Sequence, residues 1–231
     1  SDYDNDGDVD LGVAAMYDRS TVYRNVGHSL LRAWSARDSR SRDVGFGDWD
    51  GDGDEEFAEA ITGGMANHVY QASQGSFSHA WKSPNAEKTS ALDWGDFDGD
   101  NDDDLVTVSH KNSHMDIRVF QSSGGSLKEV WTNDQGEAIR DVEWADWDGD
   151  GDLDFATITA AGYVDVFSQC SAERCDQVDN DCDGKIDEDF PKRGQNCSVG
   201  TGACEATGKY VCNASKDGTT CNATAGEPTS E

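Results

Sequence analysis

Carboxylate side chains recur at alternate positions in four short segments of the sequence, and this spacing could bind a hard divalent cation. The segments are DYDNDGDVD, DWDGDGDEE, DFDGDNDDD and DWDGDGDLD, which begin at Asp2, Asp48, Asp96 and Asp146. Carboxylates this close repel one another unless a cation lies among them, and oxygen ligands in such numbers are typical of calcium sites. We therefore predict four calcium-binding loops. The alternative interpretation is four solvated acidic turns without metal.

Within each segment, positions 1, 3, 5 and 9 supply the predicted carboxylate ligands, and position 7 supplies a backbone carbonyl. Position 6 is glycine in three copies and Asn101 in the other, which suits a sharp turn with positive φ. Position 9 of the second copy is Glu56, whose longer side chain predicts a looser or bidentate site. The predicted metal residues are Asp2, Asp4, Asp6, Asp8 and Asp10; Asp48, Asp50, Asp52, Asp54 and Glu56; Asp96, Asp98, Asp100, Asp102 and Asp104; Asp146, Asp148, Asp150, Asp152 and Asp154.

The residues after each loop predict strands. The runs LGVAAMY, FAEAIT, LVTVSH and FATITA are short and rich in β-branched and aromatic residues. A helix-loop-helix calcium site would need a glutamate at position 12, and only Glu59 meets this requirement. The loops are therefore expected to join strands.

The acidic loops belong to a longer repeat of about 48 residues. Each repeat has an aromatic residue at loop position 2, a later Val-aromatic pair and, in three copies, a tryptophan after a turn. These aromatic residues are Tyr3, Trp49, Phe97 and Trp147; Tyr23, Tyr70, Phe120 and Phe167; Trp34, Trp81 and Trp131. Four short antiparallel strands per repeat are typical of a β-propeller blade. We predict an all-β fold: a partial β-propeller, an open arc of about 3.5 four-stranded blades with about fourteen strands, in which the aromatic residues pack between blades.

Composition separates this region from a small C-terminal module. The 231 residues include 47 acidic and 18 basic side chains, a net charge of -29, which argues against nucleic-acid binding. No apolar run is long enough to span a membrane. All seven cysteines lie from Cys170 onward, which predicts a disulfide-rich, loop-rich module and an oxidising compartment. Metal-ligating cysteines are the alternative, although no C-x-x-C pair is present. The odd count leaves one thiol unpaired or paired outside this chain, which we expect to be a processed or truncated piece.

Residues 1–169 resemble the FG-GAP or VCBS repeat family. The resemblance is carried by the D-x-D-x-D-G-x-x-D loop leading into LGVAA or FATIT, by VY or VF, and by a glycine turn before tryptophan. It implies an integrin-α-like propeller in which the loop between the first two strands of a blade holds calcium.

Residues 170–231 resemble a MopE-like metal-binding module of bacterial secreted surface proteins, through CDQVDNDCDGKIDE and the cysteine-rich stretch that follows. The same spacing recurs there with Gly184 at position 6, and it predicts a fifth calcium site in the tail. A Cys175–Cys182 disulfide is expected across this loop, and the alternative is an acidic disulfide knot without metal. The predicted ligands are Asp179, Asp181, Asp183, the Lys185 carbonyl and Asp187.

No enzymatic activity is predicted. The five histidines, His28, His68, His79, His110 and His114, occupy no repeated or paired position, and neither a nucleophile elbow nor a phosphate-binding glycine loop is present. We expect a secreted or cell-surface protein whose calcium ions rigidify a propeller used for adhesion or for recognition of a protein or carbohydrate. The alternative is the non-catalytic, calcium-stabilised part of a secreted polysaccharide-active enzyme. Transition-metal capture by the tail is disfavoured by its oxygen-rich ligand set.

Overall fold

The chain forms two compact units dominated by antiparallel strands. The structure is a computed structural model that describes residues 1–226 except 74, 112–113, 136–137 and 182–183. The first unit comprises residues 1–147 and 152–168, and the second comprises residues 148–151 and 169–231. That residues 1–169 and 170–231 are separate domains stays a prediction. Among the described residues, no helix has the length and apolar character needed to cross a membrane.

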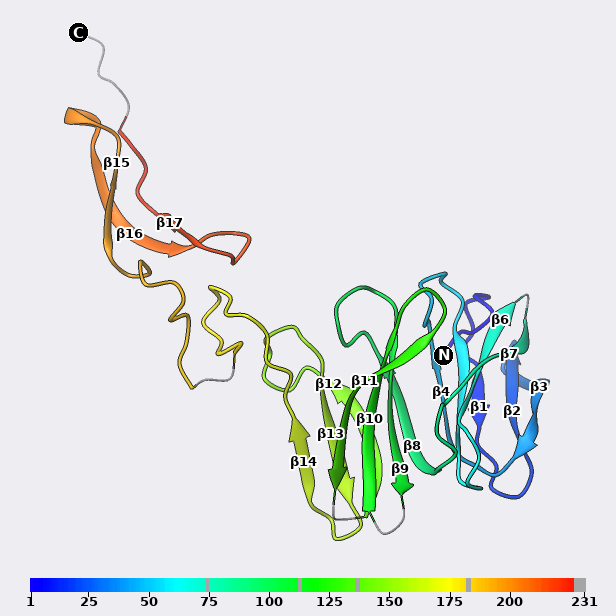
Figure 1. The fold of residues 1–231 in the computed structure, drawn as a ribbon. Coiled ribbons are helices and arrows are strands. Elements are labelled where there is room, and N and C mark those ends of the chain that lie inside the picture. Colours follow the sequence, from blue (N-terminus) through cyan, green and yellow to red (C-terminus); the bar gives the residue numbers. More distant parts are fainter. Residues whose placement is uncertain (74, 112–113, 136–137, 182–183, 227–231) are drawn as a thin grey trace. The chain divides into compact units, whose positions relative to one another are not determined.

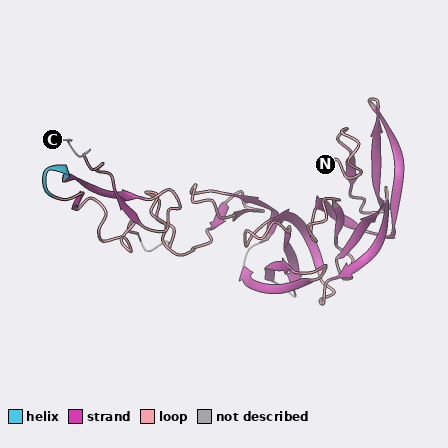
Figure 2. Ribbon diagram, turned by 90° about the horizontal axis from the view of Figure 1, so that it is seen from above, coloured by secondary structure: helices cyan, strands magenta, loops and turns pink. Residues whose placement is uncertain are grey.

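In its described residues the first unit has four antiparallel sheets, each built from consecutive strands (Figure 1). Figure 2 shows that strands dominate this unit. Two sheets have four strands, in the orders β4-β5-β6-β7 and β11-β10-β9-β8, and two have three, β1-β2-β3 and β12-β13-β14. These fourteen strands confirm the predicted all-β partial propeller of about 3.5 blades. Their bounds are β1 Leu11–Val13, β2 Arg19–Val26, β3 Ser29–Ser39, β4 Ser41–Gly47, β5 Glu56–Ile61, β6 His68–Ser73, β7 Ser76–Lys82, β8 Lys88–Gly95, β9 Asp104–Lys111, β10 His114–Ser122, β11 Leu127–Gln135, β12 Ile139–Ala145, β13 Asp154–Thr159 and β14 Val164–Phe167.

Neighbouring sheets cover both faces of the strands between them. Every residue of β5 is buried. Phe57 lies in the cluster that faces the sheet β1-β2-β3, and Ala58 lies in the cluster that faces the sheet β11-β10-β9-β8. The first strands β4, β8 and β12 also contact one another in series. Packing on both faces explains why even the polar residues Glu56 and Glu59 of β5 are fully buried.

Three clusters of aliphatic and aromatic side chains form the core of the described part of the first unit, each between two neighbouring sheets. Edge-to-face and stacked ring pairs recur in them, and the repeated aromatic residues therefore pack between blades as predicted. The largest members are Tyr3, Trp34, Phe57 and Tyr70 in the first cluster, Trp49, Trp81, Trp94 and Phe120 in the second, and Trp131, Trp144, Phe155 and Phe167 in the third.

Trp147 departs from this pattern, since it is 68% exposed. The aromatic residue at loop position 2 elsewhere packs against the following sheet, as Phe97 does against Trp144 of β12. Trp147 belongs to the last sheet in the described part of this unit, and its ring therefore has no following blade to pack against.

The second unit has a three-stranded sheet of β15 (Asn196–Val199), β16 (Ala206–Cys212) and β17 (Thr219–Cys221), with one short helix, η1 (Gly202–Cys204). Disulfides join Cys175 to Cys212 and Cys197 to Cys221, which confirms a disulfide-rich module. Cys170 is also disulfide-bonded, and Cys204 is the unpaired thiol that the odd cysteine count predicted.

The predicted Cys175–Cys182 bridge is wrong. The Cys175 N–H donates to the Lys216 carbonyl at 2.8 Å, and this contact places Cys175 beside the end of β16, where Cys212 lies. Cys182 itself lies outside the described residues.

Candidate metal sites

The acidic segments share one backbone turn. We name residues 2–10 loop 1, 48–56 loop 2, 96–104 loop 3, 146–154 loop 4 and 179–187 the tail loop. In loop 2 the Asp48 carboxylate accepts the N–H groups of Asp52 at 3.1 Å and Gly53 at 3.0 Å. Loops 1 and 3 repeat both bonds, and in the tail loop the Gly184 N–H donates to Asp179 at 2.9 Å. The position-1 carboxylate therefore closes the turn in loops 1, 2 and 3 and in the tail loop.

Loops 2, 3 and 4 join the first two strands of their sheets, and each gathers three carboxylates. Oxygens from positions 1, 3 and 9 lie within 4.8 Å of one another in each of these loops. The groups are Asp48, Asp50 and Glu56; Asp96, Asp98 and Asp104; Asp146, Asp148 and Asp154. In loop 1 the corresponding group is Asp2, Asp4 and Asp6, so that position 5 takes the place of position 9.

Positions 5 and 7 mainly shape the loops. The position-5 carboxylates Asp6, Asp52 and Asp100 each accept the N–H of the residue at position 7, at 2.9 to 3.0 Å. In loop 4 the Asp150 side chain is buried and Asp152 is half-buried. The metal-ligand roles predicted for positions 5 and 7 stay predictions.

Loop 2 has the electrostatic features of a cation site. Glu56 is fully buried, and its Oε1 accepts hydrogen bonds from Gln71 Nε2 at 2.9 Å and from the Ala72 N–H at 3.1 Å. Glu56 Oε2 and Asp50 Oδ1 are buried without a hydrogen-bond partner among the described residues. Burial raises the pKa of Glu56 to about 8, and the nearby charges of Asp50 and Asp52 add to this shift. Buried carboxylate oxygens without partners are costly, and a calcium ion among them would remove that cost.

In loops 1 to 3, position 9 also accepts a backbone N–H from the strand that carries the repeated Val-aromatic pair. Asp104 accepts the Ser122 N–H of β10 at 2.6 Å and the Phe97 N–H at 2.9 Å. Burial raises the pKa of Asp104 to about 6. In loop 4, Asp154 accepts the Trp147 N–H at 2.8 Å. A cation bound at position 9 would therefore connect two strands of one blade, and the residues of loops 2 to 4 fit calcium.

Loop 1 fits calcium less well because an arginine already contacts it. Arg24 of β2 lies 2.7 Å from Asp4 and 2.8 Å from Asp6. The hydrogen bond from Arg24 lowers the pKa of Asp6, whereas burial raises the pKa of Asp4 in spite of that arginine.

Neighbouring loops of the first unit are bonded to one another. Asn5 Nδ2 of loop 1 donates to the Gly53 carbonyl and to Asp54 Oδ1 of loop 2, both at 3.0 Å. The Asp48 N–H donates to the Asp103 carboxylate at 3.0 Å, and the Asp103 N–H donates to the Asp48 carbonyl at 2.8 Å. These bonds connect loop 1 to loop 2 and loop 2 to loop 3.

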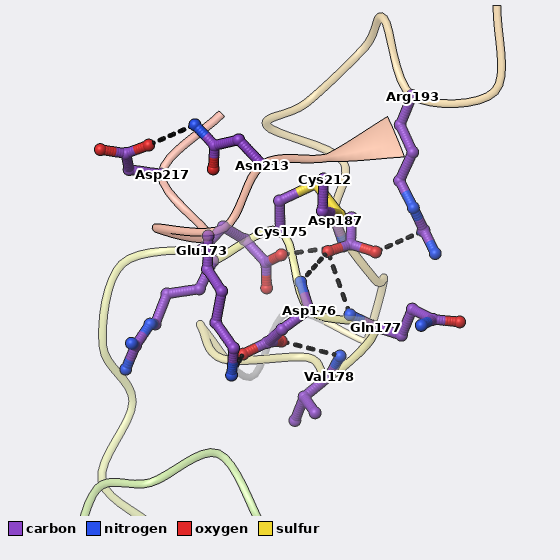
Figure 3. The surroundings of a disulfide bond; sticks show 12 residues. Glu173, Cys175, Asp176, Gln177, Val178, Asp187, Arg193, Cys212, Asn213 and Asp217 are labelled. Carbon is purple, nitrogen blue, oxygen red and sulfur yellow. Dashed lines mark hydrogen bonds and ion pairs between the residues drawn. A yellow bond between two sulfur atoms is a disulfide. The ribbon is translucent and has the colours of Figure 1, made fainter. Parts of the chain in front are cut away.

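The tail loop uses its position-9 residue differently (Figure 3). Asp187 is buried, accepts the N–H groups of Asp176 at 2.8 Å and Gln177 at 3.2 Å, and forms an ion pair with Arg193. Glu173 accepts the Asp187 N–H at 2.8 Å. Because the Asp187 carboxylate already has these partners, it is a poorer calcium ligand than Glu56.

The remaining tail ligands give no further support. Asp183 lies outside the described residues, and Lys185 is exposed. Asp179 holds the turn through Gly184, and Asp181 is half-buried. The fifth calcium site stays a prediction.

The sequence alone did not identify several residues that contact the loops. Arg24, Gln71 and Gln121 directly follow the repeated aromatic residue of the third strand, and a polar residue at that fixed position was the available signal. Pairing of β6 with β7 also brings the rings of His68 and His79 to 4.9 Å, a contact that their sequence positions did not indicate.

Comparison with protein families identifies the repeats of the first unit. The FG-GAP-like repeat family matches residues 2–59 and 96–157, which together make up more than half of the chain. The chain therefore belongs to the FG-GAP-like repeat family. None of the curated proteins compared with the sequence matches it. One similar solved chain comes from a crystal structure of BBS1N in complex with ARL6DN, soaked with lead. It has 10% sequence identity and a TM-score of 0.49, and the match covers 95% of this chain and 65% of that one.

Proposed function

We propose that this chain is a calcium-stabilised propeller segment that acts outside the cell in ligand recognition or adhesion. The carrying observation is in loop 2, where Asp50 Oδ1 and Glu56 Oε2 are buried without hydrogen bonds in a turn that the other blades repeat. Membership of the FG-GAP-like repeat family and the two disulfides of the second unit support an extracellular role.

The chemistry of the loops favours calcium over other common metals. Their candidate ligands are carboxylates, without histidine or cysteine in the groups, which disfavours zinc and copper. Position 9 is glutamate in loop 2 and aspartate in loops 3 and 4. This variation suits calcium, which accepts a variable number of ligands, better than magnesium, which requires octahedral geometry.

Calcium would contribute chiefly to stability. Extracellular calcium modules have dissociation constants of about 0.1 to 1 mM. At about 1 mM calcium, a site with a dissociation constant of about 0.1 mM adds about 1.4 kcal/mol to the free energy of unfolding. Three such loops would add about 4 kcal/mol, a large part of the net stability of a typical domain.

A cleft on the first two blades is the candidate ligand surface. It measures about 660 Å³, and aromatic and basic side chains line it together. Aromatic faces stack on sugar rings or apolar side chains, while arginine and lysine bind carboxylates, and the cleft therefore suits an acidic carbohydrate or peptide. The lining residues include Trp34, Arg37, His68, Tyr70, His79 and Lys82.

Isothermal titration calorimetry of the full chain with calcium chloride tests the metal part of this proposal. We expect saturable binding of at least three ions with dissociation constants below about 1 mM. Magnesium chloride at the same concentrations serves as the control and should give weaker heats. The absence of saturable calcium uptake would refute the proposed role.

An array of acidic and neutral glycans tests the ligand part. The Arg37→Gln/Lys82→Gln double variant removes both positive charges from the cleft without touching an acidic loop. We expect it to lose binding to acidic glycans while it keeps its calcium stoichiometry. Equal glycan binding by the variant and the wild type would exclude this cleft as the ligand surface.

A further inference from the structure

Arg24 reaches the acidic residues of loop 1 from strand β2. Its Nε lies 2.7 Å from Asp4 Oδ2, and its Nη2 lies 2.8 Å from Asp6 Oδ2. The Asp4 side chain is only 8% exposed. The guanidinium group therefore places a permanent positive charge against positions 3 and 5 of the loop, beside the place where a calcium ion would bind.

The equivalent position holds a neutral amide in the next two blades. Gln71 Nε2 donates to Glu56 of loop 2 at 2.9 Å, and Gln121 Nε2 donates to Asp98 of loop 3. Since all three side chains follow the repeated aromatic residue of the third strand, their contacts with the loops are directly comparable. Of these three side chains, only Arg24 brings a positive charge to its loop.

Loop 1 nevertheless retains the carboxylates of a calcium site. Asp10 is buried at position 9, and its Oδ1 accepts the Asn25 N–H at 2.7 Å, as Asp104 accepts the Ser122 N–H in loop 3. Asp4 Oδ1 and Asp10 Oδ2 are buried without hydrogen bonds among the described residues. Replacement of the arginine would therefore leave oxygen ligands ready for a metal ion.

We propose that Arg24 is the built-in cation of loop 1, so that loop 1 stays free of calcium at the millimolar concentrations that fill loops 2 to 4. A calcium ion would have to break two ion pairs and approach a fixed positive charge. The proposal rests on the proposed function for the occupancy of loops 2 to 4, whereas the role of Arg24 as a cation for loop 1 does not depend on calcium.

The test compares the wild-type chain with Arg24→Gln, which installs the residue found in the next two blades. Arg32→Gln is the matched control, because Arg32 lies on the adjacent strand β3 and contacts Ser35 rather than a loop. Equilibrium dialysis against radioactive calcium at 2 mM measures the ions bound per chain. Thermal melting in EDTA, followed by tryptophan fluorescence, measures the stability of the calcium-free fold.

We expect Arg24→Gln to bind one more calcium ion per chain than the wild type, while Arg32→Gln binds the same number. In EDTA, Arg24→Gln should melt at a lower temperature than Arg32→Gln, because Asp4 and Asp6 lose their ion pairs with Arg24. Equal calcium stoichiometry of all three proteins, with calcium bound, would overturn the proposal. If no variant binds calcium, the proposed function fails, and equal melting temperatures of the two variants in EDTA would then overturn the role of Arg24 as well.

Discussion

The first unit buries aromatic side chains between its sheets, whereas the buried residues of the second unit are mainly disulfide-bonded cysteines and polar side chains such as Glu173, Asn180 and Asp187. All seven tryptophans lie in the first unit, and all seven cysteines lie in the second. Acidic turns of the same design occur in both. The same turn therefore accompanies two different means of stabilisation, packing between sheets in one unit and covalent cross-links in the other.

The largest predicted difference between the two units is their response to removal of calcium by a chelator. Removal of calcium from loops 2 to 4 is expected to cost the first unit about 4 kcal/mol, which lowers its melting temperature by about 10 °C. Tryptophan fluorescence reports only the first unit, so that melting with EDTA or with 2 mM calcium measures this change directly. Magnesium added back in place of calcium is the control. Identical melting curves in EDTA and in calcium would show that metal does not contribute to the stability of the first unit.

The converse experiment removes a covalent link from the second unit. The Cys175–Cys212 disulfide closes a segment with a sequence separation of 37 residues, and its loss should destabilise the unit by about 3 to 4 kcal/mol through the entropy of the unfolded chain. We expect the Cys175→Ser/Cys212→Ser variant to become sensitive to protease in residues 170–226. Its tryptophan melting curve should match that of the wild type.

Cys204→Ser supplies the matched control for this variant, because Cys204 is the free thiol. It should keep the protease resistance of the wild type. Equal protease resistance of the double serine variant would show that the second unit does not depend on this disulfide.

The pH dependence of the stability of the calcium-free protein tests the contribution of a single residue of the first unit, Glu56. Burial raises the pKa of Glu56 from an ordinary value near 4.5 to about 8, and the folded chain therefore favours the protonated carboxyl. The resulting stabilisation is complete below about pH 4.5 and is lost as the pH rises through about 8. We expect the melting temperature in EDTA to fall across this range, and calcium affinity to rise, because calcium requires the ionised carboxylate.

Glu56→Gln isolates this contribution. The neutral amide should flatten the pH dependence in EDTA and raise the calcium-free stability at pH 8 by about 1 to 2 kcal/mol. In calcium the same variant should lose one bound ion, worth about 1.4 kcal/mol at about 1 mM. An unchanged pH profile would show that Glu56 is not the group that titrates.

Repetition made most of the first unit predictable from its sequence. The strands and the acidic turns follow from local alternation and from glycines at fixed positions, and four copies confirmed each pattern internally. Three features depended on which strands lie side by side, and this information is not local. The contact of Arg24 with Asp4 requires the register of β2 against loop 1, and the pairing of Cys175 with Cys212 requires the position of β16. Trp147 is exposed because a fixed sequence position packs only where a following sheet exists.

The smallest predicted effect concerns the bonds between neighbouring loops of the first unit. The described part of the second unit has no equivalent array of bonded loops. Gly51 in loop 2 has a φ of +68°, and a Cβ atom there would lie directly against Asp102 of loop 3. Gly125 has a φ of +73° in the β10–β11 turn, with open space around its Cα. Both glycines carry the same backbone cost of substitution, and only Gly51 adds a clash with the next blade.

Gly51→Ala and Gly125→Ala therefore form a matched pair. Each should lose about 1 kcal/mol from the left-handed backbone conformation alone. Gly51→Ala should lose further stability in calcium and should weaken calcium binding at loop 3, because Asp102 must move away and the adjacent Asp103–Asp48 bonds move with it. Chemical denaturation at 2 mM calcium measures both changes. Equal losses in the two variants would show that neighbouring loops fold independently, and that each calcium site stabilises its own blade without support from the next.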